Sequence, residues 1–492
     1  MNSKTVAWIG SILIVVTVFV SYYGSIRIGF LGDDWWFLGK AATLNLPEYI
    51  KFYFDPAAQI FWYRPLYGIL LLLEYGFFRS SPEGYHIGQI VLHAINSLLL
   101  FAVVWQLSQR RRLALVSALL YAVLPVNNLA IFWIAVQDPL SMLFYLASVW
   151  CWVIHLQTGG RYYAWLAFGA FILALLGKES SVFLPVTLFL IDWLLVSKHS
   201  TPREWVRRYA PFGIALLVYL VVEQRVQTYG YFPNRWGYGI GVHILENLAR
   251  YGSLSIFPWG EDLPVVSYIL LALALAILIP FGIWKRSRWL LFFAIELLLT
   301  IAPALAFPTA FFQARYLYFA AAVTATLLAL FVELIANSPI HRRWAIAAPL
   351  IAVVFVLASS SMTFAAADKR AEEARQMRVP IRDIFQQHPA YPPGTLLYFV
   401  EPPYPMIMRN LSGMFLMRYG PGVNVWSNDA EWGGVDEDRF AHLRDNAPSW
   451  VYYFDESGNR HEIAVDPVAP SSASPSPPLN FQNGIRLEGF EV

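Results

Sequence analysis

The sequence is poor in cysteine and in charge. Its 492 residues include one cysteine, Cys151, so no intrachain disulfide can form. Charged residues make up 14% of the chain, whereas a soluble domain carries about a quarter. The net charge of +2 is too small to indicate a nucleic-acid partner. No repeat of about 34 residues is visible, which argues against a helical repeat array.

Apolar residues are abundant instead, at 57% of the chain, with 16% aromatic. A helix needs about 20 apolar residues to cross a bilayer, and the chain has many runs of that length. We therefore predict an all-α polytopic membrane protein with about eleven transmembrane helices. They are expected near 6–24, 84–105, 113–131, 138–156, 162–177, 181–196, 209–226, 265–284, 289–307, 315–336 and 344–366.

Two apolar runs need separate interpretation. The first, from about Val6 to Tyr23, has no small-residue cleavage site after it, so we expect a retained anchor rather than a signal peptide. The run from Tyr67 to Phe78 is too short to span and is interrupted by Glu74. An interfacial or re-entrant helix is expected there.

The distribution of basic residues predicts the orientation. Dense clusters at 110–112, 198–208, 285–288 and 341–343 fall on the same side as the N-terminus, which is therefore expected in the cytoplasm. The loops on the opposite side are long, aromatic and sparsely basic. We expect an integral protein of the bacterial plasma membrane.

An odd number of spans places the C-terminal region outside the cytoplasm. We predict a transmembrane domain at 1–366 and an extracytoplasmic domain at 367–492. The latter starts with a charged, helix-like stretch and has strand-like runs at Thr395–Val400 and Trp450–Phe454, which suit a small α+β fold. A Pro/Ser-rich linker is expected near 466–478.

Ionisable residues gather at the outer ends of the predicted spans. The acid pair Asp33-Asp34 follows the first span, and a further acid, a basic-acidic pair and two arginines lie at other outer ends: Asp138, Lys178-Glu179, Arg64 and Arg315, the last followed by Tyr316 and Tyr318. A charge at membrane depth is costly unless it is paired or hydrated. We therefore expect one aqueous pocket at the outer interface to collect these residues.

Each candidate also has a structural interpretation. Asp33-Asp34 could be a solvated pair, or could cap a helix that begins at Trp35. Asp138, before Pro139, fits a helix N-cap with proline in the first helical position.

The basic candidates have structural alternatives too. Lys178-Glu179 fits an interfacial ion pair, and Arg315 could snorkel to lipid headgroups. Glu296 lies deep in a predicted span without an evident partner in the sequence.

Grouped together, these residues suit transfer of a sugar. A carboxylate can deprotonate an acceptor hydroxyl, and Lys and Arg can stabilise the phosphate of a departing lipid carrier. Nucleotide sugars are not supplied outside the cytoplasmic membrane, so an outward-facing transferase needs a lipid-linked donor.

Several stretches carry a family resemblance: 32–36 (Gly-Asp-Asp-Trp-Trp), 63–66 (Tyr-Arg-Pro-Leu), 85–87 with 92–96, Trp133 to Leu140, 175–180 with Pro185, and 314–318 (Ala-Arg-Tyr-Leu-Tyr). In them the sequence resembles the GT-C superfamily of polyprenyl-phosphate-sugar-dependent glycosyltransferases. Within it, the membrane region is most similar to the transmembrane O-mannosyltransferases with tetratricopeptide repeats and their bacterial relatives. The resemblance extends over about residues 1–366.

The resemblance implies roles for the residues that match. Asp33 or Asp34 would be the catalytic base or orient the acceptor, and in some relatives the acid there helps to hold a divalent metal. Asp138 matches a second outer-loop acid. Lys178 and Arg315 match positions near the donor phosphate, and Arg64 is grouped with them.

Two departures from the family pattern limit what carries over. The C-terminal repeats are missing, so specificity for a protein acceptor does not transfer. The turn Ala135-Val136-Gln137 lacks the expected basic residue, which weakens inference about the donor sugar.

We therefore predict a membrane glycosyltransferase that moves a sugar from a polyprenyl-phosphate donor to an unidentified extracytoplasmic acceptor, by inversion with an aspartate base. The alternative is a transporter or flippase of a lipid-linked or polar substrate. Transporters tend to place ionisable groups near the bilayer midplane and to contain paired repeats. Here the ionisable groups gather at the outer helix ends instead, and no internal repeat is found. A third alternative is a noncatalytic scaffold, in which the acids would be dispensable.

Overall fold

The structure is a computed structural model. It describes residues 3–58, 62–196, 201–229, 238–258, 264–285, 287–336, 344–402, 408–427, 446–455, 459–465, 479–480 and 486–487. The predicted linker at 466–478 lies outside these residues.

The chain divides into two compact units. Residues 1–28, 50–70 and 82–371 form the first, which we call the helical unit, and residues 29–49, 71–81 and 372–492 form the second, the sheet unit. The residues after the first span, which include Asp33 and Asp34, thus belong with the C-terminal region.

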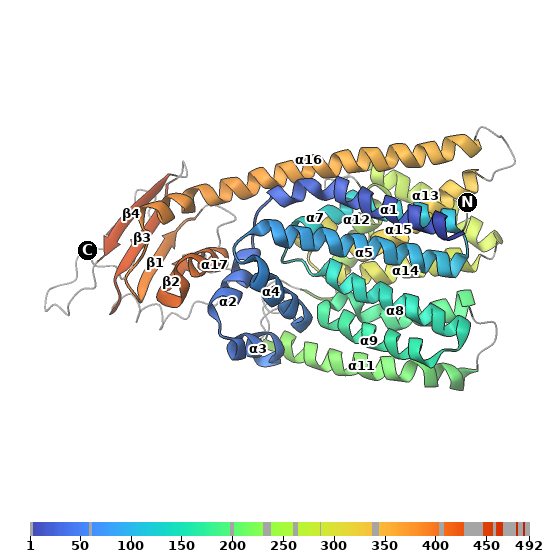
Figure 1. The fold of residues 1–492 in the computed structure, drawn as a ribbon, viewed down its shortest axis with the longest axis horizontal. Coiled ribbons are helices and arrows are strands. Elements are labelled where there is room, and N and C mark those ends of the chain that lie inside the picture. The colour runs from blue at the N-terminus through green and yellow to red at the C-terminus, as the bar shows by residue number, and fades with distance from the viewer. Residues whose placement is uncertain are drawn as a thin grey trace. The chain divides into compact units, whose positions relative to one another are not determined.

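The helical unit is a bundle of apolar helices (Figure 1). Its first half contains α1 (Ser3–Tyr22), η1 (Tyr23–Arg27), η2 (Pro56–Ala58), α5 (Pro82–Ser108), α6 (Arg111–Val123), η3 (Pro125–Asn127), α7 (Asn128–Phe132), α8 (Asp138–Thr158) and α9 (Arg161–Gly177). Its second half contains η4 (Glu179–Phe183), α10 (Leu184–Leu190), η5 (Ile191–Val196), α11 (Pro202–Tyr229), α12 (His243–Ile256), α13 (Val265–Lys285), α14 (Arg288–Leu305), η7 (Thr309–Phe311), η8 (Ala314–Leu317) and α15 (Tyr318–Ala336).

Three helices have residues in both units: α3 (Leu46–Phe54), α4 (Pro65–Phe78) and α16 (Trp344–Gln387). α4 is apolar but only 14 residues long, in agreement with the predicted short helix. α16 joins the last predicted span to the charged stretch after it without a break, over 44 residues. The junction is rich in Ala, Glu, Lys and Arg, which are strong helix formers.

Among the described residues, eight helices are long and apolar enough to cross a membrane, or nine if a bent pair counts as one span. The pair is α6 with the η3–α7 segment, bent by 50° where Pro125 follows Leu124. Proline has no N–H to continue the helical ladder, so it breaks the span predicted at 113–131. Two further predicted spans coincide with α9 and α13, whose apolar stretches are shorter. The polytopic helical fold is confirmed, and the count of eleven stays a prediction.

The sheet unit contains a four-stranded sheet in the order β2-β1-β3-β4. Its strands are β1 (Thr395–Val400), β2 (Val423–Ser427), β3 (Ser449–Phe454) and β4 (Arg460–Val465). β1 lies parallel to both β2 and β3, and β4 is antiparallel to β3. β5 (Leu479–Asn480) and β6 (Arg486–Leu487) form a separate antiparallel pair. The two strand-like runs noted in the sequence are β1 and β3, and a small α+β region near the C-terminus is confirmed.

Helices pack against this sheet and share an apolar core with it. The core combines the end of α16 with the sheet and with α17 (Met408–Tyr419), which leads through η9 (Gly420–Gly422) into β2; its members include Ile384, Phe399, Phe415 and Tyr452. The division at residue 366/367 stays a prediction, since α16 is continuous there.

α2 (Asp34–Thr43) packs against α17 at two glycines. A Cβ on Gly39 would lie 2.9 Å from the Cα of Gly413, and a Cβ on Gly413 would collide with the backbone of Trp35. Only glycine allows backbones to approach this closely. α2, which begins at Asp34 directly after Asp33, is therefore packed against α17 of the C-terminal fold.

Candidate functional site

A buried ion pair joins two of the candidates in the helical unit. The Lys178 ammonium donates to Asp138 Oδ2 at 2.5 Å, with the side chains 4% and 1% exposed. Gln137 is the N-cap residue and Asp138 the first residue of α8, so the Asp138 carboxylate is used on Lys178 rather than as the N-cap. Burial lowers the pKa of Lys178, and the carboxylate of Asp138 opposes that change.

A second ion pair lies next to the first. Arg64 donates to both carboxylate oxygens of Glu179, at 2.7 to 2.9 Å, and its Nη1 donates to Gln137 Oε1 at 2.6 Å. Lys178 and Glu179 are thus not paired with each other but with partners on other elements. Gln137 stands where a basic residue was expected, and here it serves as an acceptor for Arg64.

Arg315 has a different environment. Its guanidinium lies over the ring of Trp133, 4.6 Å from the centroid, and 5.1 Å from that of Tyr316. Its Nε is buried without a hydrogen-bond partner, and no acidic group pairs with it among the described residues. Within the described part of the chain it is therefore a cation that two aromatic rings position and with which no carboxylate pairs.

Tyr316 connects these groups. The Lys178 ammonium lies 5.5 Å from the centre of its ring, and Arg315 donates weakly to its hydroxyl at 3.4 Å. The ring itself stacks on Phe307, with centroids 4.9 Å apart. Six of the predicted residues are therefore brought together in the helical unit: Arg64, Asp138, Lys178, Glu179, Arg315 and Tyr316.

Tyr318 lies in a buried hydrogen-bond network instead. Its hydroxyl contacts His93 Nδ1 at 2.8 Å and accepts from Asn96 Nδ2 at 3.2 Å. Asn96 also donates to the carbonyl of Pro139 at 2.9 Å, at the start of α8. This network braces the helix end that carries Asp138, and Tyr318 is fully buried in it.

The acid pair belongs to the sheet unit, where its two members differ. Asp33 forms an ion pair with Arg409 of α17, and its side chain is 30% exposed. Asp34 is 1% exposed, and its Oδ2 accepts the backbone N–H of Leu31 at 2.8 Å. Asp33 precedes α2 but makes no side-chain capping bond. Asp34 thus fixes the loop, whereas Asp33 is the more exposed acid of the two.

Arg409 was not singled out in the sequence. It lies in a segment without a recognisable motif, 376 positions away from its partner. Only the close packing of α2 on α17 brings the two together.

The fit of a divalent metal to the acid pair is poor. Asp33 is already paired with a guanidinium, and Asp34 accepts a backbone N–H. Within the described part of the chain, no group of three or more His, Cys, Asp or Glu side chains could hold an ion.

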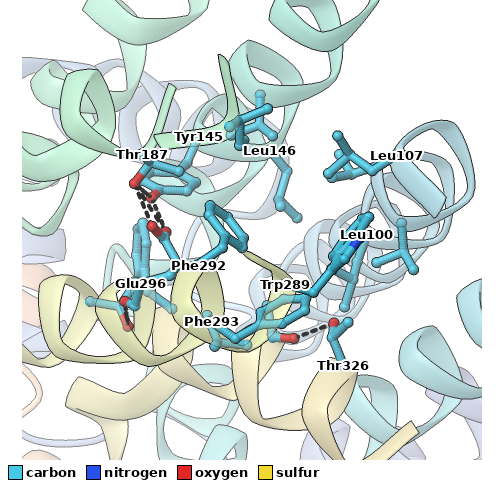
Figure 2. A pocket seen from close by; sticks show the side chains of 18 of the residues that line it. Leu100, Leu107, Tyr145, Leu146, Thr187, Trp289, Phe292, Phe293, Glu296 and Thr326 are labelled. Carbon is cyan, nitrogen blue, oxygen red and sulfur yellow. Dashed lines mark hydrogen bonds between the residues drawn. The ribbon is translucent and has the colours of Figure 1, made fainter. Parts of the chain in front are cut away.

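Glu296, the acid without an evident partner, is hydrogen-bonded within the bundle (Figure 2). Its carboxylate accepts from Tyr145 at 2.7 Å and from Thr187 at 2.8 Å. The three side chains border a cavity of about 70 Å³ whose other lining residues are mostly apolar, with Leu100, Phe292 and Phe293 among them. Glu296 is thus satisfied inside the protein and takes no part in the cluster around Arg315.

Comparisons with known proteins agree with this fold. Residues 65–226 match the family described as dolichyl-phosphate-mannose-protein mannosyltransferase. A curated relative, the Protein O-mannosyl-transferase TMTC3 of Mus musculus, is 30% identical over 149 residues, which cover 28% of this chain and 16% of the mouse protein.

Two solved structures share the fold over nearly the whole chain. ArnT from Cupriavidus metallidurans, bound to undecaprenyl phosphate, superposes with a TM-score of 0.54 at 14% identity, covering 93% of this chain and 94% of ArnT. Its apo form gives a TM-score of 0.53, also at 14% identity, over 92% of this chain and 94% of that one. The family model and the mouse relative each match only part of this chain, and the likeness to ArnT is one of fold.

Proposed function

We propose that the protein transfers a sugar from a polyprenyl-phosphate donor to an extracytoplasmic acceptor, in a single inverting displacement. The donor phosphate would bind at Arg315, with Lys178 and Arg64 beside it, and Asp33 would accept the proton of the acceptor hydroxyl. The N-terminus would lie in the cytoplasm and the sheet unit outside it.

The observation that carries this proposal is the state of Arg315. Lys178 and Arg64 each have a carboxylate partner, whereas Arg315 is held between two rings with a buried, unused N–H donor. A phosphate provides the acceptor oxygens and the negative charge that such a guanidinium lacks. As phosphate leaves the sugar, its charge grows, and a positioned cation stabilises it most at that moment.

Asp33 is the acid best placed to act as the general base. A general base must be ionised and within reach of the acceptor hydroxyl. The Asp33 carboxylate pairs with Arg409 and remains partly exposed, so an acceptor hydroxyl can approach it. Asp138 is less suited to this role because it is buried against Lys178. We assign Asp138 to holding Lys178, and Asp34 to holding the loop.

A polyprenyl carrier suits the fold. The similar ArnT structure holds undecaprenyl phosphate. The helical unit offers several apolar spans next to a cationic cluster, which is the combination that an isoprenoid chain with a phosphate head requires.

The test uses the full chain in lipid nanodiscs with polyprenyl-phosphate sugars and a panel of acceptors. We expect wild type to form a glycosylated product with inverted anomeric configuration, measured by NMR. Asp33→Asn should lose transfer, and Asp34→Asn should lose less if it still folds. Full activity in Asp33→Asn would remove it as the base. Movement of the lipid-linked substrate across the bilayer without bond cleavage would instead support the flippase alternative.

A further inference from the structure

The sheet unit contains a cavity of about 360 Å³ lined by basic and apolar side chains. Trp35 from α2 and Met414 from α17 form part of the wall, and the end of α16 forms the rest. Among the residues that the structure describes, no acidic side chain lines it, and those that do line it belong to the sheet unit. The cavity is separate from the cluster around Arg315, which belongs to the helical unit.

Three arginines of α16 line this cavity. Arg375, Arg378 and Arg382 are spaced by three and four residues, so they share one helix face. Two of them have acidic partners on the same helix, Arg375 with Glu372 at 2.8 Å and Arg382 with Asp383 at 3.5 Å.

Both of these ion pairs are weakly held. The side chains of Arg375 and Arg382 are 71% and 62% exposed, and pairs so exposed contribute little. A bound anion can therefore replace these partners at small cost.

Arg378 is more firmly placed. Its Nε donates to the carbonyl of Ala374 at 3.0 Å, and its guanidinium lies against Gly29. A Cβ on Gly29 would lie 2.9 Å from Nη1, and the residue has a φ of +80°, which favours glycine. The loop before the acid pair thus leaves room for this arginine.

Trp35 adds an aromatic side chain to the wall of this cavity. It follows Asp33 and Asp34 directly in the chain, so the cavity is lined by the same short segment that carries the proposed base.

We propose that this cavity binds the acceptor through an anionic group, a phosphate monoester or a carboxylate, carried on a sugar ring. Guanidinium groups match the planar fork of such oxygens. Phe385, Val379 and Met414 form an apolar wall suited to the carbon face of the ring. The identification of the ligand as the acceptor rests on the proposed function.

The first test measures binding alone. The full chain in phosphatidylcholine nanodiscs is titrated with glucose 6-phosphate, glucuronate and glucose, followed by calorimetry. These probes share a hexose ring and differ in the anionic group, so they distinguish phosphate from carboxylate recognition. We expect binding of at least one charged probe, weakened by salt, and none of glucose. Equal binding of all three, or binding of none, would overturn the proposal.

Substitutions locate the site. Arg378→Gln with Arg382→Gln should weaken binding at least tenfold, and Arg378→Lys, which keeps the charge, should weaken it less. Arg418→Gln is the matched control, because Arg418 is an exposed residue of the same unit that does not line the cavity. Arg382→Gln alone changes only an exposed side chain and should leave the fold intact. It therefore tests the site even if the double variant does not fold.

A second control separates this cavity from the donor site. Arg315→Gln should leave binding of the charged hexose unchanged. Loss of binding in Arg315→Gln, with none in the α16 variants, would place the anion at the phosphate site of the helical unit and overturn the proposal.

The last test links the cavity to transfer. The bound hexose should inhibit transfer competitively against the acceptor but not against the donor, and the α16 variants should raise the acceptor KM with little change in kcat. Noncompetitive inhibition would show that the cavity does not hold the acceptor. A wild type that binds the charged hexose but transfers no sugar would refute the proposed function and leave the anion site standing.

Discussion

Arg409 in α17 and Asp33 before α2 form an ion pair that ties the loop after the first span to the C-terminal fold. The guanidinium is 8% exposed and the carboxylate 30%, so the acid faces a fixed cation on one side and remains accessible on another.

We expect Arg409→Gln to lower kcat for transfer, because the ion pair with Arg409 holds the Asp33 carboxylate in place. Arg409→Lys, which keeps the charge, should retain more activity than Arg409→Gln. Single-turnover transfer provides the measurement, and Arg418→Gln serves as control. Wild-type kcat in Arg409→Gln would show that transfer does not need this ion pair.

Asp33→Asn should reduce kcat by about 10²–10⁴-fold, the usual contribution of a general base, with little change in KM for the donor. Single-turnover transfer from the lipid-linked sugar measures the chemical step directly. A variant that keeps wild-type kcat would exclude Asp33 as the base.

Arg315→Gln should weaken donor binding. Hydrogen bonds to a charged group contribute about 1.5–3 kcal/mol, which corresponds to a rise in donor KM of about tenfold or more. Arg250→Gln is the matched control, because Arg250 also lies over a ring, that of Phe312 at 4.0 Å, but hydrogen-bonds to the carbonyl of Thr309. A rise in acceptor KM alone would contradict the assignment of Arg315 to the donor.

Asp138 and Lys178 should behave as a coupled pair. Replacing one partner leaves the other charge buried, at a cost of about 3–5 kcal/mol, so Asp138→Asn and Lys178→Gln should each lower the unfolding temperature. The double variant should be more stable than the sum of the two changes predicts. Thermal unfolding in nanodiscs provides the measurement. If the double variant regains stability but not activity, one of the two also contacts substrate.

Glu74 should make stability depend on pH. Burial raises the pKa of Glu74 to about 8, against 4.5 in the unfolded chain. Between these values the unfolded chain has lost its proton and the folded one has not, so stability falls as pH rises from about 4.5 to 8. At pH 7 the loss is about 3 kcal/mol.

Glu74→Gln should flatten this dependence and stabilise the protein above pH 6. Unfolding temperatures are compared from pH 5 to 8, with Glu246→Gln as control, because Glu246 is 59% exposed. Parallel curves for wild type and Glu74→Gln would show that Glu74 is ionised in the folded state.

The sequence predicts the membrane helices well because lipid imposes a simple rule on composition and length. The bend at Pro125 and the continuity of α16 depend on local helix chemistry, which is also readable from single residues. The position of ionisable residues at the outer ends of the predicted spans indicates which of them gather near Arg315. Which of them pair cannot be predicted, because Lys178 and Glu179 are neighbours in sequence yet have different partners.

The sequence does not reveal which side chains from distant segments pair with the candidate acids. Arg409 lies 376 positions from Asp33, and Glu296 meets Thr187 and Tyr145 only through helix packing. No local pattern marks such contacts. A single carboxylate in an apolar helix therefore indicates that a partner exists without naming it.

The glycine contact between α2 and α17 has a mechanical consequence. With the backbones touching at Gly39 and Gly413, α2 has no freedom to slide or tilt by itself. Any opening that admits an acceptor to Asp33 must displace α2 and α17 as one body, with hinges elsewhere in the chain. Gly413→Ala would force α2 and α17 apart at Trp35, two residues from Asp33, so a loss of turnover in this variant would report on how precisely the acid must be positioned.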